Sequence, residues 1–238
     1  MYNVYSRHLR HIVLPSFGIT SQDVLKKSKI LCVGTGGLGS PVITYLTMLG
    51  VGNIGIIDFD YVETSNLNRQ FIFKDNDIGK SKVLLAQKYI KNLNKDIHIS
   101  VYNTLLNHNN CLHLFKNYNV VIDCTDNLNA KLLISDSAIK INIPVVHGSI
   151  FGFEGYVTIF NKNYNCYRCT YSSIKINNCI DYGVFGPTAG IIGIIQASET
   201  IKILLNKNIT LKSKLLIIDL ENLKFKCINI NKKKCIIC

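Results

Sequence analysis

Two short cysteine pairs in this sequence have the Cys-x-x-Cys spacing that metal sites use. The first pair is Cys166 and Cys169, and the second is Cys235 and Cys238, the final residue. Four thiolates make a closed tetrahedral set that suits Zn²⁺ in a structural role. We therefore predict one structural zinc per chain, which would clamp the tail onto the loop after the apolar run at 156–160. Unliganded thiols, or a redox dithiol in either pair, are the alternatives.

A glycine-rich stretch follows the first apolar run, KILCVG at 29–34. It reads GTGGLG at 34–39 and matches G-x-G-x-x-G between a strand and a helix. Glycines there permit a tight turn and a close approach of the backbone to phosphate, and the helix N-terminus favours an anion. Asp58 lies at the end of the second strand, about twenty residues on, where a ribose hydroxyl is expected. The pattern indicates a nucleotide without specifying a reaction, and by itself it favours a nicotinamide dehydrogenase.

Charged and amide side chains crowd the segment DFDYVETSNLNRQFIF at 58–73. Arg69 could hold a triphosphate through two hydrogen bonds, and Lys82 in the next helix could reach the same charge. Asp126, at the end of another strand, could hold Mg²⁺ together with phosphate oxygens. Each residue could instead be a cap, a turn residue or part of a surface ion pair. Their convergence on the sheet edge that carries the glycine stretch favours ATP.

The elements that must position these residues are alternating strands and helices. We predict buried strands at 29–34, 53–60, 97–102, 119–126 and 143–149, and helices at 38–50, 80–93 and 128–141. This alternation predicts βαβ units and a Rossmann-like, mostly parallel sheet. We predict a mixed or antiparallel continuation from a strand at 156–160, a helix from about 187 to 205, and strands at 215–220 and 224–230. The predicted fold class is thus α/β, in a single domain over 1–238 with a nucleotide-binding half at about 1–150 and a carrier-binding, zinc-bearing half at about 151–238.

Composition narrows the class of protein. The chain has 238 residues, 47% of them hydrophobic, and a net charge of +12. Its lysines are dispersed, which is typical of solvated surfaces; the functional alternative is an acidic partner, a nucleotide or an acidic protein, and nucleic acid fits less well. The N-terminal stretch is polar and no apolar stretch is long enough to span a bilayer, so we expect a cytoplasmic protein without membrane contact. In that compartment, nine cysteines favour metal or catalytic thiols over disulfides.

In combination and order, these motifs resemble the ThiF/MoeB family, bacterial relatives of ubiquitin-activating enzymes. The resemblance extends from Arg10 to the last residue and rests on GTGGLGS, DFDYVETSNLNRQ, IGKSK, DCTDN, CYRC and CIIC. It implies an adenylyltransferase that uses ATP and Mg²⁺ to activate the C-terminal glycine of a ubiquitin-like sulfur carrier ending in Gly-Gly, before thiocarboxylate formation. It also implies a homodimer, in which Arg10 would reach the phosphates of the ATP that the other subunit binds.

The resemblance further implies a role for individual residues. The side chains and backbone groups expected to bind ATP are those of Gly37, Asp58, Ser65, Asn66, Arg69, Lys82 and Asn127, with Asp126 holding Mg²⁺. Cys179, in NNCIDYGVFGP, would capture the activated carrier and take part in sulfur transfer. A loop thiol near a lysine and a helix N-terminus can have the lowered pKa that this role needs, and an ordinary loop thiol is the alternative. The catalytic set implied is Cys179, Arg10, Arg69, Lys82 and Asp126. We expect no rhodanese domain after the tail, and therefore a separate sulfur donor protein.

Several functions stay open from the sequence. The stretch GVFGPTAGIIG and the preceding Asn-Cys pair favour the branch of the family that serves thiamine thiazole synthesis, and the molybdopterin branch is the alternative. An NAD(P)-dependent dehydrogenase, a tRNA-activating dehydratase and a basic zinc-bearing nucleic-acid binder are more distant alternatives.

The remaining cysteines and one histidine favour structural roles. Cys32, Cys124 and Cys227 lie in or at the ends of predicted strands, so we expect buried thiols that pack as small hydrophobic groups. His147, at another strand end, is expected to be a buried histidine with satisfied hydrogen bonds.

Overall fold

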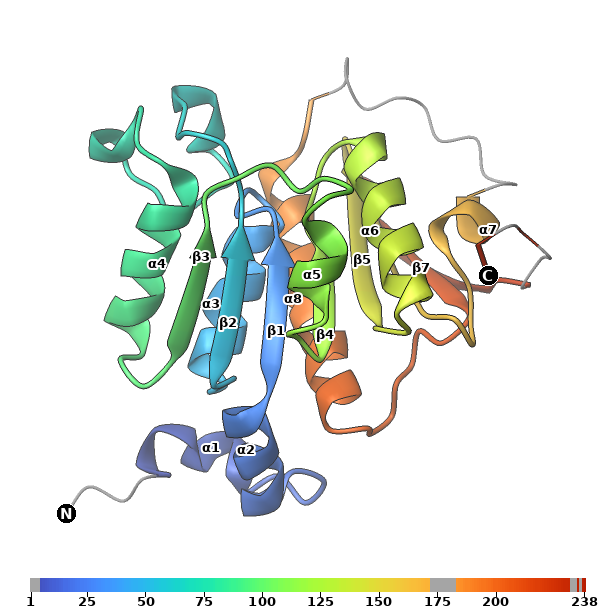
Figure 1. Cartoon of the computed structure of the whole chain (residues 1–238), viewed down its shortest axis with the longest axis horizontal. Coiled ribbons are helices and arrows are strands. Elements are labelled where there is room, and N and C mark those ends of the chain that lie inside the picture. The colour runs from blue at the N-terminus through green and yellow to red at the C-terminus, as the bar shows by residue number, and fades with distance from the viewer. Residues whose placement is uncertain (1–4, 172–182, 232–234, 236) are drawn as a thin grey trace.

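The structure is a computed structural model that describes residues 5–171, 183–231, 235, 237 and 238. Its described residues form one eight-stranded sheet in the order β3-β2-β1-β4-β5-β6-β7-β8 (Figure 1). The strands are β1 (Lys29–Val33), β2 (Asn53–Ile57), β3 (His98–Tyr102), β4 (Val120–Asp123), β5 (Val145–Phe151), β6 (Glu154–Phe160), β7 (Lys214–Asp219) and β8 (Lys224–Asn229).

The sheet changes from parallel to antiparallel pairing at β5. The pairs among β3, β2, β1, β4 and β5 are all parallel, whereas β5–β6, β6–β7 and β7–β8 are antiparallel. Helical crossovers connect the parallel strands, and short turns can connect antiparallel ones. Both the Rossmann-like half and the antiparallel continuation predicted from sequence are confirmed.

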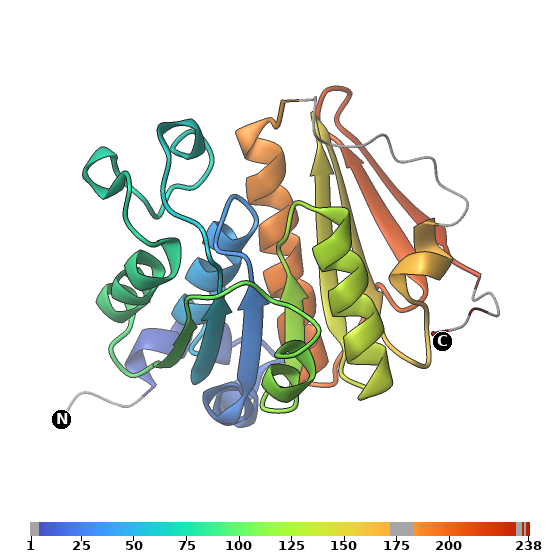
Figure 2. The ribbon, with the colours of Figure 1, turned by 45° about the horizontal axis from the view of Figure 1, so that its top comes forward.

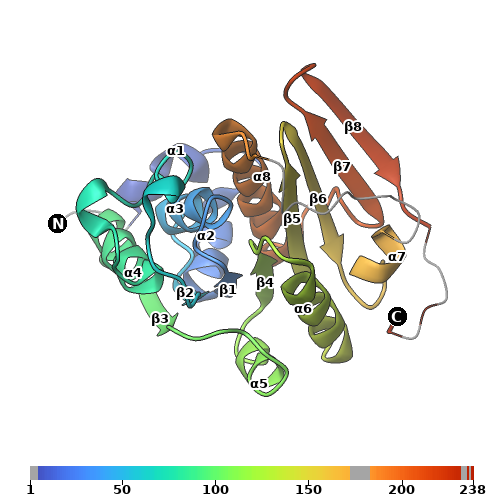
Figure 3. The same ribbon diagram turned by 90° about the horizontal axis from the view of Figure 1, so that it is seen from above.

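Two layers of helices cover the sheet, and Figure 3 shows them on its opposite faces. One layer contains α3 (Gly39–Met48), α4 (Lys82–Leu93) and α8 (Gly186–Leu204). The other contains α5 (Cys111–Phe115) and α6 (Leu128–Lys140). Neighbouring residues of β1 show why both faces are covered: Ile30 and Cys32 pack into one core, and Leu31 and Val33 into the other. A strand buried on both faces has the continuous apolar sequence that β1 shows.

Three further helices lie outside these layers. The helices α1 (Leu9–Ile12) and α2 (Gly18–Lys27) lie beyond the amino ends of the parallel strands (Figure 1). The helix α7 (Tyr167–Tyr171) lies near the antiparallel end of the sheet, close to the C-terminus (Figure 2). Short 3₁₀ helices occur at Ser6–His8, Thr64–Asn66 and Asp75–Asp77. The helices α1, α2, α5 and α7 were not among the predicted elements.

One burial prediction is wrong. Cys32 and Cys124 are buried as expected, but Cys227 is exposed. It lies on β8, the edge strand of the sheet, and most residues of that strand are exposed. Among the described residues, none of the helices combines the length and the apolar character that crossing a membrane requires.

Candidate functional site

The glycine stretch forms a tight connection between β1 and α3 at the carboxyl end of the sheet. The N–H of Gly34 donates to the carbonyl of Ile57 at 2.9 Å, and Gly34 has a φ of +91° that favours glycine. A Cβ on Gly39 would lie 2.2 Å from the carbonyl oxygen of Gly34. The first turn of α3 can therefore approach the loop this closely only with glycine at position 39.

Asp58 holds this loop in place. Its Oδ2 accepts hydrogen bonds from the backbone N–H of Thr35 at 2.8 Å and from the Thr35 hydroxyl at 3.0 Å. Its Oδ1 accepts from the N–H of Asp60 at 3.0 Å. The carboxylate therefore ties the end of β2 to the glycine stretch on β1, and its predicted contact with a ribose stays a prediction.

The segment after β2 lies against the glycine stretch. A Cβ on Gly37 would lie 3.4 Å from Cγ of Arg69 and 3.3 Å from Cβ of Ala189, on α8. A Cβ on Gly186, at the start of α8, would lie 3.5 Å from Cβ of Arg69. Arg69 is thus placed between the glycine stretch and the N-terminus of a long helix, which is a favourable position for an anion.

Arg69 is oriented by its own segment. Its Nη1 donates to the carbonyl of Ser65 at 2.8 Å and to Oδ1 of Asn68 at 3.0 Å. Asn66 is buried, and its Oδ1 accepts from the N–H of Glu63 at 3.2 Å. Asn66 therefore stabilises the turn that carries Ser65 and Arg69, and among the contacts described no acidic group neutralises the guanidinium.

Lys82 supplies a second cation near the same edge. It begins α4, and its Nζ donates to Oδ2 of Asp60 at 3.0 Å. The lysine side chain is 7% exposed and that of Asp60 is 46% exposed. Because Asp60 is close to solvent, the ion pair is partly screened. Asp60 lies two residues after Asp58, so the pair holds the Lys82 side chain close to the end of β2.

The residues predicted to hold Mg²⁺ lie on the turn between β4 and α6. Asp126 and Asn127 are both exposed. Asn127 is the N-cap of α6, and its Oδ1 accepts from the N–H of Ala130 at 2.9 Å. An N-cap of this kind satisfies a free N–H of the first helical turn. Asp126 is thereby presented at the carboxyl edge of β4, which pairs with β1.

A buried charged cluster lies directly beneath that turn. Asp123 and His147 are opposite each other on β4 and β5, both are fully buried, and His147 Nδ1 lies 2.7 Å from Asp123 Oδ2. Burial alone would raise the pKa of Asp123, but the Lys131 charge and the hydrogen bond from His147 outweigh it and lower that pKa below its usual range. Burial, reinforced by the charge of Lys131, lowers the pKa of His147. The expectation of a buried histidine with satisfied hydrogen bonds is confirmed.

The four predicted zinc ligands come together. The sulfurs of Cys166, Cys169, Cys235 and Cys238 all lie within 4.8 Å of one another. Four of the Sγ–Sγ distances are 3.6, 3.4, 3.3 and 3.5 Å. Sulfurs bound tetrahedrally at the usual Zn–S distance of about 2.3 Å lie about 3.8 Å apart. The sulfur positions therefore fit a tetrahedral metal ion.

Backbone amides support this cluster in the manner of a metal knuckle. The N–H of Cys169 donates to Sγ of Cys166 at 3.4 Å, and that of Cys238 donates to Sγ of Cys235 at 3.3 Å. Burial raises the pKa of the Cys166 thiol to about 11. A cation is therefore needed to hold this sulfur as the thiolate that metal binding requires.

Two predicted catalytic residues are not found at the glycine stretch: one lies at the other end of the sheet, and the other lies outside the described residues. Arg10 is exposed on α1, whose neighbour His8 lies against Gly50 in the turn before β2. Arg10 therefore lies at the amino end of the sheet and not at its own nucleotide edge. Cys179 lies outside the described residues.

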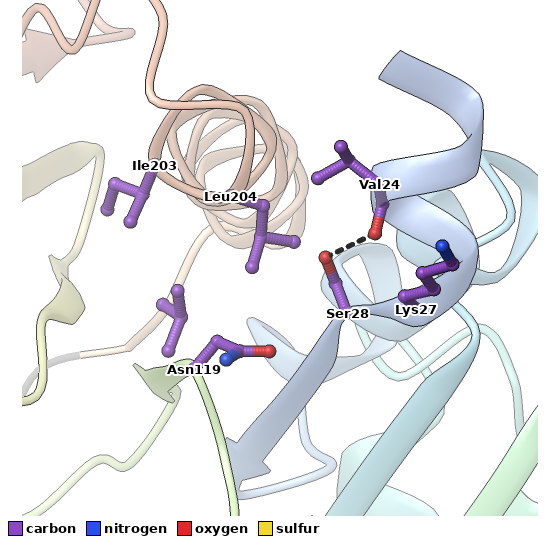
Figure 4. A pocket seen from close by; sticks show the side chains of 7 residues that line it. Val24, Lys27, Ser28, Asn119, Ile203 and Leu204 are labelled. Atoms are coloured by element: carbon purple, nitrogen blue, oxygen red, sulfur yellow. Dashed lines mark hydrogen bonds between the residues drawn. The ribbon is translucent and has the colours of Figure 1, made fainter. Parts of the chain in front are cut away.

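A cavity of about 370 Å³ lies at the amino end of the sheet, away from the glycine stretch. Figure 4 shows its lining between the end of α8 and the α2–β1 connection: Val24, Lys27, Ser28, Asn119, Val120, Ile203 and Leu204. None of these residues was predicted to bind ligand.

Comparisons with known proteins agree with this arrangement. A protein-family model described as the ThiF family matches residues 6–237. The probable molybdopterin-synthase adenylyltransferase of Porphyra purpurea is 41% identical over 236 residues, covering 94% of this chain and 61% of that protein. The adenylyltransferase and sulfurtransferase MOCS3 of Culex quinquefasciatus is 38% identical over 243 residues, covering 99% of this chain and 56% of that protein. The chain thus spans between 56% and 61% of the length of these two relatives.

The fold also matches a solved structure. The crystal structure of E. coli MccB with ATP is similar with a TM-score of 0.86 and 24% identity, covering 100% of this chain and 74% of that one. At this identity the likeness concerns the fold alone.

Proposed function

Because this chain belongs to the ThiF family, we propose that it uses ATP to adenylate the C-terminal glycine of a ubiquitin-like sulfur carrier protein. The observation that carries the proposal is the placement of Arg69 against Gly37 and the start of α8. A dehydrogenase would leave that arginine and Lys82 without a function, whereas a triphosphate needs both. The family assignment is a second argument against the dehydrogenase, and it also argues against the nucleic-acid binder.

The reaction suits these residue types. A carboxylate oxygen of the carrier attacks the α-phosphorus, the bond from that phosphorus to the bridging oxygen breaks, and pyrophosphate leaves with the electron pair. Arg69 and Lys82 would neutralise charge on the phosphates, and the N–H groups of the glycine stretch would contact them. The carboxylate is already ionised at neutral pH, so no side chain is required as a general base.

Asp126 would hold Mg²⁺, which when bound would reduce the repulsion among the phosphates. Its exposure at the edge of β4 supports this role, because phosphate oxygens and water must complete the coordination. Gly37, Asp58, Ser65, Asn66 and Asn127 would form the rest of the ATP site.

The carrier is proposed to be of the molybdopterin-synthase type. The sequence alone favours a carrier of the thiamine pathway, but the similar proteins favour the alternative, because they include a probable molybdopterin-synthase adenylyltransferase and MOCS3. We therefore place the molybdopterin-type carrier first.

A structural zinc on Cys166, Cys169, Cys235 and Cys238 is part of the proposal. The sulfur cluster supports it, because four cysteine ligands leave no open position for catalysis. A bound zinc ion would cross-link the C-terminal tail to the segment of Cys166 and α7.

Roles for Cys179 and Arg10 complete the proposal. The family resemblance alone supports Cys179 as the thiol that captures the activated carrier. Arg10 lies at the opposite end of the sheet from the glycine stretch of the same chain. This supports a homodimer in which Arg10 acts at the nucleotide site of the neighbouring subunit.

The test is ATP–pyrophosphate exchange with purified Gly-Gly-ended carriers of the molybdopterin and thiamine pathways. We expect exchange with the molybdopterin-type carrier and none with the same carrier lacking its last glycine. Exchange with the thiamine carrier alone would restore the thiamine assignment. Absence of exchange with both, from protein that binds ATP, would refute carrier adenylation, and tRNA-dependent ATP consumption would then identify the dehydratase.

A further inference from the structure

Four side chains from β4, α6, β5 and α7 form a continuous hydrogen-bonded and ionic chain beneath the β4–α6 turn. We call them the strand-end network: Asp123, Lys131, His147 and Tyr171. We propose that the strand-end network is a positioning device that fixes the turn at 124–127 and so sets the affinity for Mg²⁺ with the nucleotide. This inference rests on the proposed function, because it takes Asp126 on that turn as the Mg²⁺ ligand.

Asp123 is the centre of the network. Its Oδ1 accepts from the N–H of Thr125 at 3.0 Å and from the Thr125 hydroxyl at 2.6 Å. Its Oδ2 accepts from Nδ1–H of His147 at 2.7 Å, because an ionised carboxylate has no proton to donate. The first residues of the turn are thereby attached to a side chain that is itself held from β5.

Lys131 attaches the other side of the turn. Its Nζ donates to the carbonyl of Thr125 at 2.6 Å and to the carbonyl of Gly148 at 2.9 Å. It also lies 3.6 Å from Asp123 Oδ2. The lysine is 5% exposed, so these contacts occur almost without water, and they join the turn to β5 a second time.

His147 passes the connection to α7. With its Nδ1 proton given to Asp123, its Nε2 accepts from the hydroxyl of Tyr171 at 3.0 Å. Tyr171 is the last residue of α7, two residues after Cys169. The imidazole also stacks on the ring of Phe160 at 5.0 Å between centroids. The network therefore extends from the nucleotide edge to the helix that contains Cys169 and that begins directly after Cys166.

Stability alone does not account for this arrangement. Removing a lysine and an aspartate from water is strongly unfavourable, and well-packed apolar residues in place of a buried ion pair are often equally stable. A polar cluster with its donors and acceptors paired instead specifies one geometry. The geometry that it specifies is that of Thr125, which directly precedes Asp126.

The test uses Tyr171→Phe, which removes one hydroxyl and keeps the ring. The matched control is Tyr118→Phe, which removes a hydroxyl from a 3.0 Å bond to Tyr102 OH that touches no residue of the turn. Mg²⁺ is titrated against each protein at fixed ATP while ATP binding is followed by calorimetry. We expect Tyr171→Phe to raise the half-saturating Mg²⁺ concentration about two- to tenfold, the range that one hydrogen bond covers, with Mg²⁺-free ATP binding and the control unchanged.

Asp126→Asn separates the possible failures. If Asp126→Asn raises the Mg²⁺ requirement and Tyr171→Phe does not, the network inference is refuted and the proposed function stands. An unchanged Mg²⁺ requirement in Asp126→Asn refutes the metal role of that residue and the inference with it. A wild-type protein that binds no ATP refutes both. Urea unfolding of each variant guards against a general loss of structure, since equal Mg²⁺ shifts in Tyr171→Phe and Tyr118→Phe would also overturn the inference.

Discussion

Gly39 is the position where α3 packs most closely on the glycine stretch, and Gly39→Ala should damage both the fold and nucleotide binding. The added Cβ would lie 2.2 Å from the oxygen and 3.0 Å from the carbon of the Gly34 carbonyl, where ordinary contact begins at 3.4 Å. Loop and helix must therefore separate by about 1 Å. Overpacking of this size costs about 1–3 kcal/mol, and a misplacement of about 1 Å can cost about 100-fold in function.

Gly36→Ala is the matched control, because its Cβ would meet only the side-chain amide of Gln70, at 3.3 Å. The free energy of unfolding in urea should fall by about 1–3 kcal/mol for Gly39→Ala and change by less than about 1 kcal/mol for Gly36→Ala. ATP binding should weaken in both, since the methyl group of Gly36→Ala would occupy the approach of the phosphate. A Gly39→Ala protein as stable as wild type would refute the packing argument. Normal ATP affinity in Gly36→Ala would refute the glycine stretch as the phosphate site.

Three further predictions follow from charges and sulfurs. Below the ordinary histidine pKa of about 6.5, and down to the lowered pKa of His147, the unfolded chain binds a proton that the folded chain excludes. As the pH is lowered through this range, the free energy of unfolding should therefore decrease by up to about 1.4 kcal/mol per pH unit. Urea titrations of His147→Gln should lack this part of the pH dependence, and a pH dependence equal to that of the wild type would contradict the prediction. Chelation of zinc, or Cys238→Ser, should lower Tm. The reason is that the metal cross-link joins residues 69 apart, and closing a loop of that length contributes about 4 kcal/mol to stability. A colorimetric zinc assay that finds no metal would contradict the zinc site. Lys82→Met should abolish ATP–pyrophosphate exchange yet change stability by less than about 1 kcal/mol, because Asp60 is 46% exposed and such pairs contribute little; retained exchange would remove Lys82 from the phosphate site.

The sequence is most informative where its spacing has a single physical meaning. G-x-G-x-x-G between a strand and a helix required glycine at both Gly34 and Gly39, and the structure shows the positive φ and the close approach responsible. The same holds for the cysteine pairs, because metal binding needs four sulfurs and only two pairs have the spacing. The glycine turn and the spacing within each cysteine pair depend on local backbone geometry, which short motifs encode well, whereas the meeting of the two pairs across 69 residues depends on the fold.

Features that depend on strand register could not be predicted in this way. Asp123 and His147 become partners only because β4 and β5 pair in parallel with these two residues opposite each other, and no local motif specifies that register. Cys227 was expected to be buried because its strand is apolar in places. The edge position of β8, which determines its exposure, follows from the order of strands in the whole sheet and not from the strand itself.

Because β5 lies where the sheet changes from parallel to antiparallel pairing, the cysteine cluster can influence the nucleotide turn as well as the stability of the fold. On one side of β5, the buried Asp123 holds the β4–α6 turn, whose exposed Asp126 lies at the proposed nucleotide site. On the other side, the chain continues through β6 to α7, whose Cys169 is held against the C-terminal tail. His147 on β5 contacts both sides, through Asp123 at 2.7 Å and Tyr171 at 3.0 Å. A metal ion that fixes α7 would therefore also fix the hydroxyl of Tyr171, and through the buried imidazole it would restrain the carboxylate that orients the nucleotide turn.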